Sequence, residues 1–299
     1  MPATDFNTDS NRGLDHVVLA VQDLQAAEAR FQALGFTTTP RARHPWGTEN
    51  ILVQMHGSFI ELLGIAAGVE MVAPKPGEFS FGHYTEDYLR EQQGLSMLVF
   101  SSQDAGADRS HWLEQGLTTY APFDFSRMAT LENGQQVPVA FSLAFVSHAE
   151  MPRAAWFVCQ QHYPENFWKP AFQQHANGAH GLASVTLAAR EPNRYRTFLE
   201  ALFSQGQLIA DHQALELNLP RGQLRVMPVS ELEAESPGIE DRVQRYGPQF
   251  SALEIQFDQL ERVLDRLQQQ RIMHTEVADR IVIPPSEVFG LTLIFSQLQ

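Results

Sequence analysis

Apolar positions recur along the chain in one repeated order: a strand-like run, a helical stripe and then further strand-like runs. The clearest copy spans residues 14–65, where LDHVVLAV precedes a helix expected from Asp23 to about Gly35. Three strand-like runs follow, TTPRARH, ENILVQM and SFIELLGI. Period-2 alternation within the strand-like runs, and a 3.6-residue period in the segment after the first run, predict a βαβββ unit.

Three more copies of this unit follow the first. The second opens with a strand at Gly94–Ser102 and continues with a helix over Asp104–Leu117. The third opens at Gly181–Ala189, and the fourth at Phe250–Phe257, where Asp258 is the expected N-cap of its helix. We therefore predict an α+β fold, with four βαβββ modules forming two paired, curved mixed β-sheets and helices outside.

The modules also predict how the chain is divided. Residues 1–12 are polar and acidic and are expected to form a disordered tail. Modules 1 and 2 form an N-terminal domain over residues 13–163, and modules 3 and 4 form a C-terminal domain over 180–299. The linker between them, residues 164–179, is rich in aromatic side chains, which pack over either a core edge or a ligand.

Composition narrows the classes of function. The chain has 35 acidic and 21 basic residues and a formal charge of −14, which argues against nucleic acid and against an anionic membrane surface as partners. Cys159 is the one cysteine, so no internal disulfide forms, and the N-terminal residues lack the pattern of a signal peptide. We expect a cytoplasmic protein without membrane spans, and a homodimer is one expected assembly.

Two ionisable residues interrupt apolar strands of the first module. His16 lies in the first strand and Glu61 in the last. A buried charge is costly unless it is paired or binds a metal ion. Each residue also has an ordinary explanation: His16 as a hydrogen-bonded core histidine, and Glu61 as the partner of an arginine such as Arg43.

The repeated unit, with histidine on its first strand and glutamate on its fourth, resembles the vicinal oxygen chelate superfamily. The blocks LDHVVLAVQDL, RHPWGTENILVQ, FIELLGI, PFDFSR and CQQHYPENFW are similar to its glyoxalase-like domain group. The resemblance implies that two modules enclose a cleft. It also implies a divalent metal ion (Zn, Fe(II), Mn, Ni or Co) that chelates two neighbouring oxygens of a substrate.

The resemblance further implies which residues bind the metal ion. His16 and Glu61 match the superfamily's first two ligand positions, whereas the second module has Met97 at its own first position. On the strand that closes the second module, alternation groups Gln160 and His162 on one face. His162 is the expected third ligand, with Gln160 as its substitute, although His162 could instead be an acid, a base or a hydrogen-bonding residue.

Four further residues are candidates for contact with a substrate: Trp46, Asn50, Phe125 and Arg127. Trp46 and Phe125 could form the wall of an apolar pocket, and Arg127 could bind a carboxylate or phosphate with two hydrogen bonds. Alternatively, Trp46 fills the mouth of the barrel and Arg127 pairs with an acid such as Asp124.

These features predict a metal-dependent enzyme that acts on a small oxygenated organic molecule as an isomerase, lyase or dioxygenase. The alternative is a non-catalytic protein of the bleomycin-resistance type, which sequesters a small ligand. Modules 3 and 4 have Ser184 and Leu253 or Glu254 near the position of the first histidine, and their closing strands have no carboxylate. The C-terminal half is therefore expected to be a degenerate copy.

Overall fold

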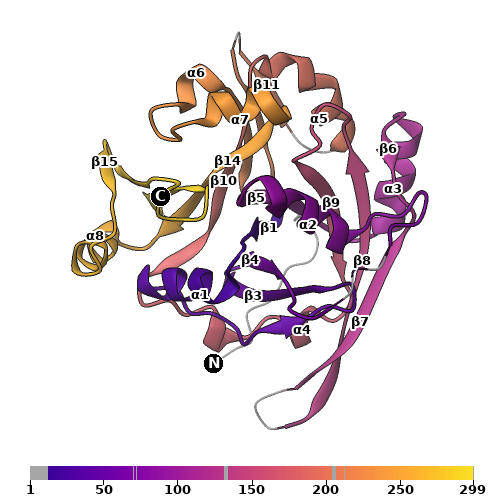
Figure 1. Cartoon of the computed structure of the whole chain (residues 1–299), viewed down its shortest axis with the longest axis horizontal. Coiled ribbons are helices and arrows are strands. Elements are labelled where there is room, and N and C mark those ends of the chain that lie inside the picture. The colour runs from indigo at the N-terminus through magenta and orange to yellow at the C-terminus, as the bar shows by residue number, and fades with distance from the viewer. Residues whose placement is uncertain are drawn as a thin grey trace.

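Two curved mixed sheets form the molecule, one from each half of the chain (Figure 1). The computed structural model describes residues 13–69, 71, 73–130, 134–203, 207–211 and 213–298. The predicted tail, residues 1–12, lies outside the described residues.

Modules 1 and 2 build the first sheet. In spatial order its strands are β2 (Ala42–Arg43), β3 (Thr48–Met55), β4 (Ser58–Ile65), β1 (Leu14–Ala20), β5 (Gly94–Ser102), β9 (Ala155–Gln161), β8 (Gln136–Ser147) and β6 (Thr118–Thr119). Strand β7 (Phe123–Thr130) also pairs with β8. Strand β1 runs parallel to β4 and antiparallel to β5, so β1 and β5 join the two modules.

Modules 3 and 4 build the second sheet in the same way. Its strands, in spatial order, are β11 (Gln207–Ala210), β12 (Leu215–Asn218), β13 (Gln223–Pro228), β10 (Ala179–Ala189), β14 (Gln249–Phe257), β17 (Thr292–Gln297), β16 (Arg280–Ile283) and β15 (Thr275–Val277). Strand β10 runs parallel to β13 and antiparallel to β14, which repeats the pairing of β1. The predicted α+β fold is confirmed, and the modules pair within one chain.

Each module contributes one helix outside the sheets. These four are α1 (Leu24–Ala33), α3 (Ala105–Glu114), α5 (Arg196–Leu202) and α8 (Leu260–Gln269). The other helices are α2 (Phe81–Glu91), α4 (Pro164–Phe167), α6 (Val229–Leu232), α7 (Ile239–Tyr246) and the 3₁₀ turns Pro170–Phe172 and Pro192–Tyr195.

Helix caps explain where two of the module helices begin. The carboxylates of Asp23 and Asp104 each accept a backbone N–H three residues ahead, at 2.9 Å, and so cap α1 and α3. The cap expected at Asp258 is wrong. Helix α8 has Gln259 at its N-cap, and the backbone N–H of Asp258 donates to Gly178 instead.

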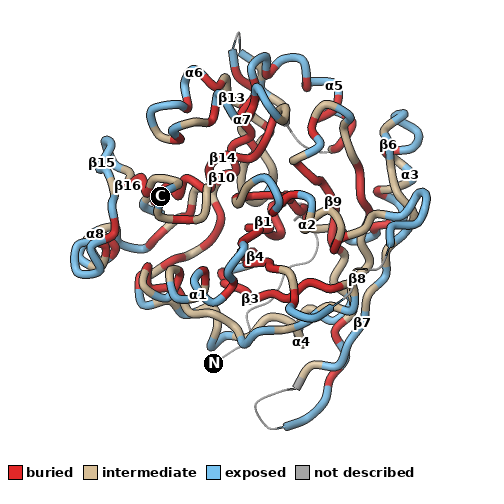
Figure 2. The backbone as a smooth tube through the Cα atoms, in the orientation of Figure 1, coloured by how far each residue is buried: buried red, intermediate tan, exposed pale blue. Residues whose placement is uncertain are grey.

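The main hydrophobic core is common to both halves. Its largest cluster contains Leu14 and Leu98 from the first sheet together with Val185 and Leu253 from the second. In Figure 2 the central strands β1, β4, β10 and β14 are mostly buried, whereas exposed residues follow the outer helices. The two sheets coincide with the two predicted halves, but these halves do not have separate main cores.

A β-bulge interrupts the start of β1. Leu14 pairs with Phe100 and His16 with Val99, so two steps along β1 match one step along β5. Asp15 is the extra residue. A bulge breaks the strict alternation of side chains, and Leu14 therefore packs in the main core, although alternation had placed it on the same face as His16.

Trp112 connects the halves and provides a test of their interdependence. Its indole N–H donates to the carbonyl of Leu202 at 3.1 Å, which links α3 to the end of α5. We expect Trp112→Phe to lower the free energy of unfolding by about 2–4 kcal/mol, because it leaves a gap and removes this donor. Urea unfolding measures the change. The control is Leu113→Ala on the same helix, because Leu113 is 48% exposed and its truncation should cost about 0.5 kcal/mol or less. Equal losses in the two variants would contradict the expectation.

Candidate functional site

The first element of the site is a buried carboxylate–imidazole pair at the bulge of β1. His16 Nδ1–H donates to Asp15 Oδ1 at 2.6 Å. The second oxygen of Asp15 accepts the amide of Gln161 from β9 at 3.1 Å. The His16 ring also stacks on Phe59, with centroids 4.1 Å apart. An ionised carboxylate only accepts hydrogen bonds, so in a neutral His16 ring this contact keeps the proton on Nδ1 and the lone pair on Nε2.

The second element is Glu61, which a separate polar chain holds. The amide of Asn50 donates to Glu61 Oε1 at 2.7 Å, and it also lies 3.3 Å from His44 Nε2. His44 Nδ1 is 2.8 Å from the hydroxyl of Thr48. Burial lowers the pKa of His44, and the positive charge of Arg127 also lowers it, whereas Glu61 raises it. His44 is therefore an uncharged member of this series of polar contacts at pH 7.

The two elements face each other without touching. His16 Nε2 and Glu61 Oε2 are 4.0 Å apart, which is too long for a hydrogen bond. Both residues are more than nine-tenths buried. Each is held on its far side by a hydrogen bond of 2.7 Å or less. A small group of a bound molecule could contact both at once.

Aromatic rings enclose this gap in a cavity of about 90 Å³, here called the inner chamber. Its apolar wall consists mainly of Trp46, Phe59, Phe125, Phe141, Phe157 and Phe167. Phe167 comes from the linker between the halves, on α4, and packs on Phe59 at 5.2 Å and on Phe141 at 5.6 Å. The aromatic linker therefore forms part of the wall of this cavity and contacts its polar centre through Phe59.

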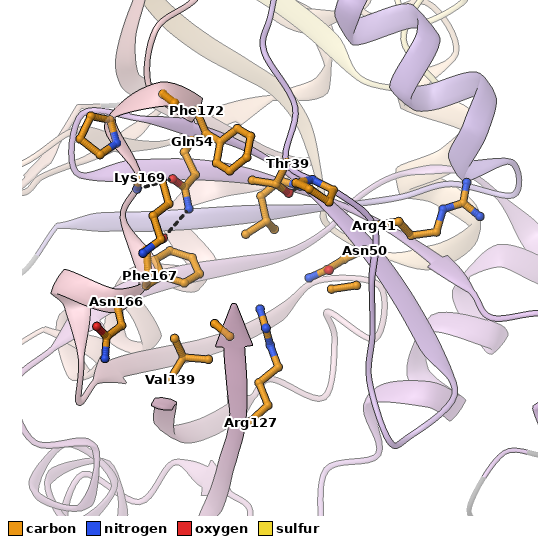
Figure 3. A pocket seen from close by; sticks show the side chains of 16 residues that line it. Thr39, Arg41, Asn50, Gln54, Arg127, Val139, Asn166, Phe167, Lys169 and Phe172 are labelled. Atoms are coloured by element: carbon orange, nitrogen blue, oxygen red, sulfur yellow. Dashed lines mark hydrogen bonds between the residues drawn. The ribbon is translucent and has the colours of Figure 1, made fainter. Parts of the chain in front are cut away.

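A wider pocket of about 760 Å³, here called the vestibule, adjoins the inner chamber (Figure 3). Asn50, Leu52, Arg127 and Phe167 line both cavities. Residues 39–42 and 169–172 form much of the remaining wall. The chamber thus opens toward solvent past Arg127.

The candidate substrate residues lie at these cavities, and one of them, Asn50, has another polar partner. Trp46 and Phe125 form chamber wall, with their rings 4.9 Å apart, and the indole N–H of Trp46 is buried without a hydrogen bond in the described part of the chain. Asn50 holds Glu61, as described above. Asp124, the alternative partner of Arg127, accepts the hydroxyl of Ser142 instead.

The structure does not bring the four expected metal ligands together. His16 and Glu61 meet, but the amide oxygen of Gln160 accepts the N–H of Ala105 at the start of α3, on the opposite face of β9. His162 lies beyond the end of β9, is exposed and bonds to the hydroxyl of Ser142 at 2.8 Å. Gln160 and His162 do share a side of the strand, because Ser142 pairs with Gln160 and bonds His162, but the other face of β9, with Phe157, Cys159 and Gln161, is the one that lines the site.

The donor set does not fit the three-ligand metal centre that the resemblance implied. Within the residues that the structure describes, no three His, Cys, Asp or Glu side chains gather as a group that could hold a metal ion. Two adjacent ligands of one ion, at bond lengths of about 2.0–2.2 Å, lie roughly 2.9–3.5 Å apart. The 4.0 Å between His16 Nε2 and Glu61 Oε2 exceeds the separation of adjacent ligands.

Cys159 lines the inner chamber but is a poor nucleophile. Burial raises the pKa of its thiol, and the negative charges of Asp15 and Glu61 raise it further. The thiol is therefore protonated at neutral pH, and a protonated thiol reacts slowly. This agrees with its expected role as a small buried residue.

The second sheet does not repeat the polar centre. Strand register places Ser184 of β10 at the position of His16 in β1, and Arg225 of β13 at the position of Glu61 in β4. Arg225 lies 3.5 Å from Glu216 on the neighbouring strand. The polar centre therefore belongs to the N-terminal half alone.

Comparison with known proteins agrees with this architecture. The family model described as a glyoxalase-like domain matches residues 14–203, which is well over half of the chain. The chain belongs to the glyoxalase-like domain family, within the vicinal oxygen chelate superfamily. No curated protein matches this glyoxalase-like chain.

Solved structures share the fold of the glyoxalase-like chain at low sequence identity. A hypothetical protein from Staphylococcus aureus has a TM-score of 0.66 at 13% identity, covering 95% of this chain and 98% of that one. A triple mutant of 4-hydroxymandelate synthase from Streptomyces coelicolor has a TM-score of 0.55 at 13% identity, covering 96% and 93%. A fusion protein of a xylose isomerase-like TIM barrel and 4-hydroxyphenylpyruvate dioxygenase has a TM-score of 0.52 at 13% identity, covering 96% and 49%.

Sequence reasoning missed several residues of the site in the glyoxalase-like chain. Asp15, His44 and Gln161 were not among the candidate residues. One signal was present, because Asp15 is a second ionisable residue in the apolar run LDHVVLAV.

Among the described residues, no helix is long and apolar enough to cross a membrane.

His175 fixes the linker of the glyoxalase-like chain beside the site. Its Nδ1 accepts the N–H of Thr37 at 2.9 Å, and its Nε2 bonds the carbonyl of Gln54 at 2.7 Å. Both bonds form together only in the neutral ring, because a protonated ring has no acceptor. Burial is the main cause that lowers the pKa of His175 below 6.5 in the folded chain.

The linker contact should make stability depend on pH. As the pH falls below about 6.5, the unfolded chain binds the proton more readily than the folded one, so the free energy of unfolding decreases. Above that pH this group contributes no slope. We expect His175→Gln to lose less stability than wild type between about pH 7.5 and about pH 5.5, because the glutamine side chain does not titrate. Urea midpoints at both values provide the measurement, with His274→Gln as the control. A slope equal to that of wild type would refute this role of His175.

Proposed function

We propose that this chain is an enzyme that moves a proton within a small oxygenated organic molecule, as an isomerase or lyase does. The observation that supports this most is the 4.0 Å gap between His16 Nε2 and Glu61 Oε2, inside a chamber lined by aromatic rings. A proton acceptor and a second polar group then face one small volume from two sides. Membership of the glyoxalase-like family supports chemistry at this cleft at the family level only.

His16 is the proposed base. Asp15 fixes its ring and tautomer and stabilises the imidazolium that forms when Nε2 takes a proton. Glu61, held by Asn50, accepts a hydroxyl of the substrate and so orients the neighbouring C–H bond toward Nε2. In an isomerisation of a hydroxycarbonyl compound, Nε2 returns the proton to the former carbonyl carbon, and Glu61 passes the hydroxyl proton to the former carbonyl oxygen. In an elimination the proton stays on His16, and the leaving group departs with the electron pair of its bond to carbon.

The aromatic chamber assists this transfer by excluding water. Phe59 stacks on His16, and Phe157 packs against the same ring at 5.7 Å, so His16 has little freedom to rotate. In a chamber of about 90 Å³ a substrate group displaces most of the solvent. Charge–charge interactions among Asp15, His16 and Glu61 are stronger in such surroundings than in water.

A second candidate is the binding protein that sequesters its ligand. The observation in its favour is the apolar surface that the second module presents, where Met97 is fully buried and no ionisable residue replaces it. In this case ligands bind in the chamber without reaction.

Proton exchange tests the proposal without knowledge of the product. Wild-type protein is incubated in D₂O with a panel of hydroxyketones, hydroxyaldehydes and keto acids, and NMR follows exchange of the protons next to the carbonyl. We expect exchange of at least one class, a loss of about 10³-fold or more in His16→Gln, and a loss of about 10²-fold or more in Asp15→Asn. His274→Gln is the matched control, in a histidine of the other half.

Metal analysis of the same samples separates acid–base catalysis from metal chelation. We expect exchange to survive dialysis against a chelator, because His16 and Glu61 alone give too few ligands for tight binding of a divalent ion. One equivalent of transition metal in wild type, absent from His16→Ala and Glu61→Ala, would replace the acid–base proposal with a metal-dependent one. Ligand binding without any exchange would favour the sequestering protein.

A further inference from the structure

The cavities of the site differ too much in size to accept the same part of a ligand. The inner chamber, at about 90 Å³, is well below the roughly 300–1,000 Å³ of pockets that enclose a whole drug-sized ligand. The vestibule, at about 760 Å³, lies within that range. A molecule whose reacting group reaches His16 and Glu61 therefore has only a small end in the chamber, and the rest of it lies in the vestibule.

The charged side chains of the vestibule are all basic. They are Arg41, Arg127 and Lys169, and no acidic residue lines this pocket among those that the structure describes. The chain as a whole carries a formal charge of −14, with 35 acidic and 21 basic residues. Such a protein repels anions at long range. The basic vestibule therefore has the opposite charge to the molecule as a whole.

Two of the three cations are available to a ligand. Arg41 is bound to Glu49, with its guanidinium 3.1 Å from Oε1, and its side chain points away from the pocket in Figure 3. The side chains of Arg127 and Lys169 form no hydrogen bond or ion pair within the described parts of the chain. In Figure 3 Arg127 rises from β7 toward Asn50, and Lys169 lies across the pocket beside Gln54.

Arg127 also connects the vestibule to the polar centre. It lines both cavities, and its positive charge helps to lower the pKa of His44. His44 is close to Glu61 through Asn50. An anionic group beside Arg127 would therefore lie next to the entrance of the inner chamber. The uncharged end of the same molecule then points toward His16.

We infer that the substrate carries an oxyanion, a carboxylate or a phosphate, which binds between Arg127 and Lys169 while its small carbonyl or hydroxyl end enters the inner chamber. This inference rests on the proposed function for the identity of the reacting end. Binding of the oxyanion itself does not require catalysis. Guanidinium and ammonium groups both bind these oxyanions through charge-assisted hydrogen bonds.

Calorimetric titration with three probes of similar shape tests the inference: 3-phenylpropionate, 2-phenylethyl phosphate and the neutral 3-phenylpropanamide. We expect at least one of the two anions to bind about tenfold or more tightly than the amide, because hydrogen bonds between charged partners exceed neutral ones by about this factor. The ratio of the two anions tells which oxyanion the vestibule prefers. Added salt should weaken the anions and leave the amide unchanged.

The matched variants locate the binding. Arg127→Gln with Lys169→Gln should weaken the preferred anion about tenfold or more and leave the amide as in wild type. Arg43→Gln is the control, because it removes one positive charge from β2 at a residue that pairs with Glu49 and does not line the vestibule. Amide binding as tight as that of both anions, or anion binding unchanged in the double variant, would overturn the inference.

Proton exchange and anion binding fail independently. If the anions bind at Arg127 and Lys169 but no panel compound exchanges its protons, the proposed function is wrong and the oxyanion site stands. If neutral compounds exchange as fast as their anionic counterparts, the oxyanion site is wrong and the proposed function stands.

Discussion

The bulge in β1 is the constraint on which the site depends. Regular alternation would send Asp15 and His16 to opposite faces of the sheet, yet their side chains meet at 2.6 Å. The extra residue against β5 makes this contact possible, and Gln161 from β9 then holds the free oxygen of Asp15. One departure from strand geometry thus fixes the orientation of an imidazole in a strand whose other residues, apart from Asp15, are apolar and buried.

The rest of the site follows from how the sheet is ordered. Strand β1 lies between β4 and β5, so Glu61 of β4 faces His16 across one parallel pairing. Strand β3 lies next to β4 and places Asn50 behind Glu61. Because both modules pair through β1 and β5, aromatic residues of the second module reach the same cavity. The first module supplies most of the polar residues of the site, and both modules supply its apolar wall. The two copies of the repeated unit therefore contribute differently to the site.

The fold could be predicted from the sequence because apolar periodicity repeats four times, and each repeat supports the others. The meeting of His16 and Glu61 was also predictable, since both stand in strands of one module. Which face of β9 lines the site could not be predicted. Trp156 and Val158 pack in one core cluster while Phe157 and Cys159 pack in another, so both faces are apolar and alternation alone gives no phase. The bulge at Asp15 was hidden for a similar reason, because a single inserted residue leaves no trace in a seven-residue apolar run.

The linker gives the C-terminal half a place in the site although its sheet has no polar centre. Phe167 and Trp168 both pack on Phe59, directly behind His16, and the same segment leads into β10. The family match agrees with this, because it does not end where the first sheet ends but continues to residue 203, through β10 and α5. The family match is therefore larger than one pair of modules. A copy of the first half excised at residue 163 would lose a wall of its own cavity, so the linker has to be kept for the chamber to form.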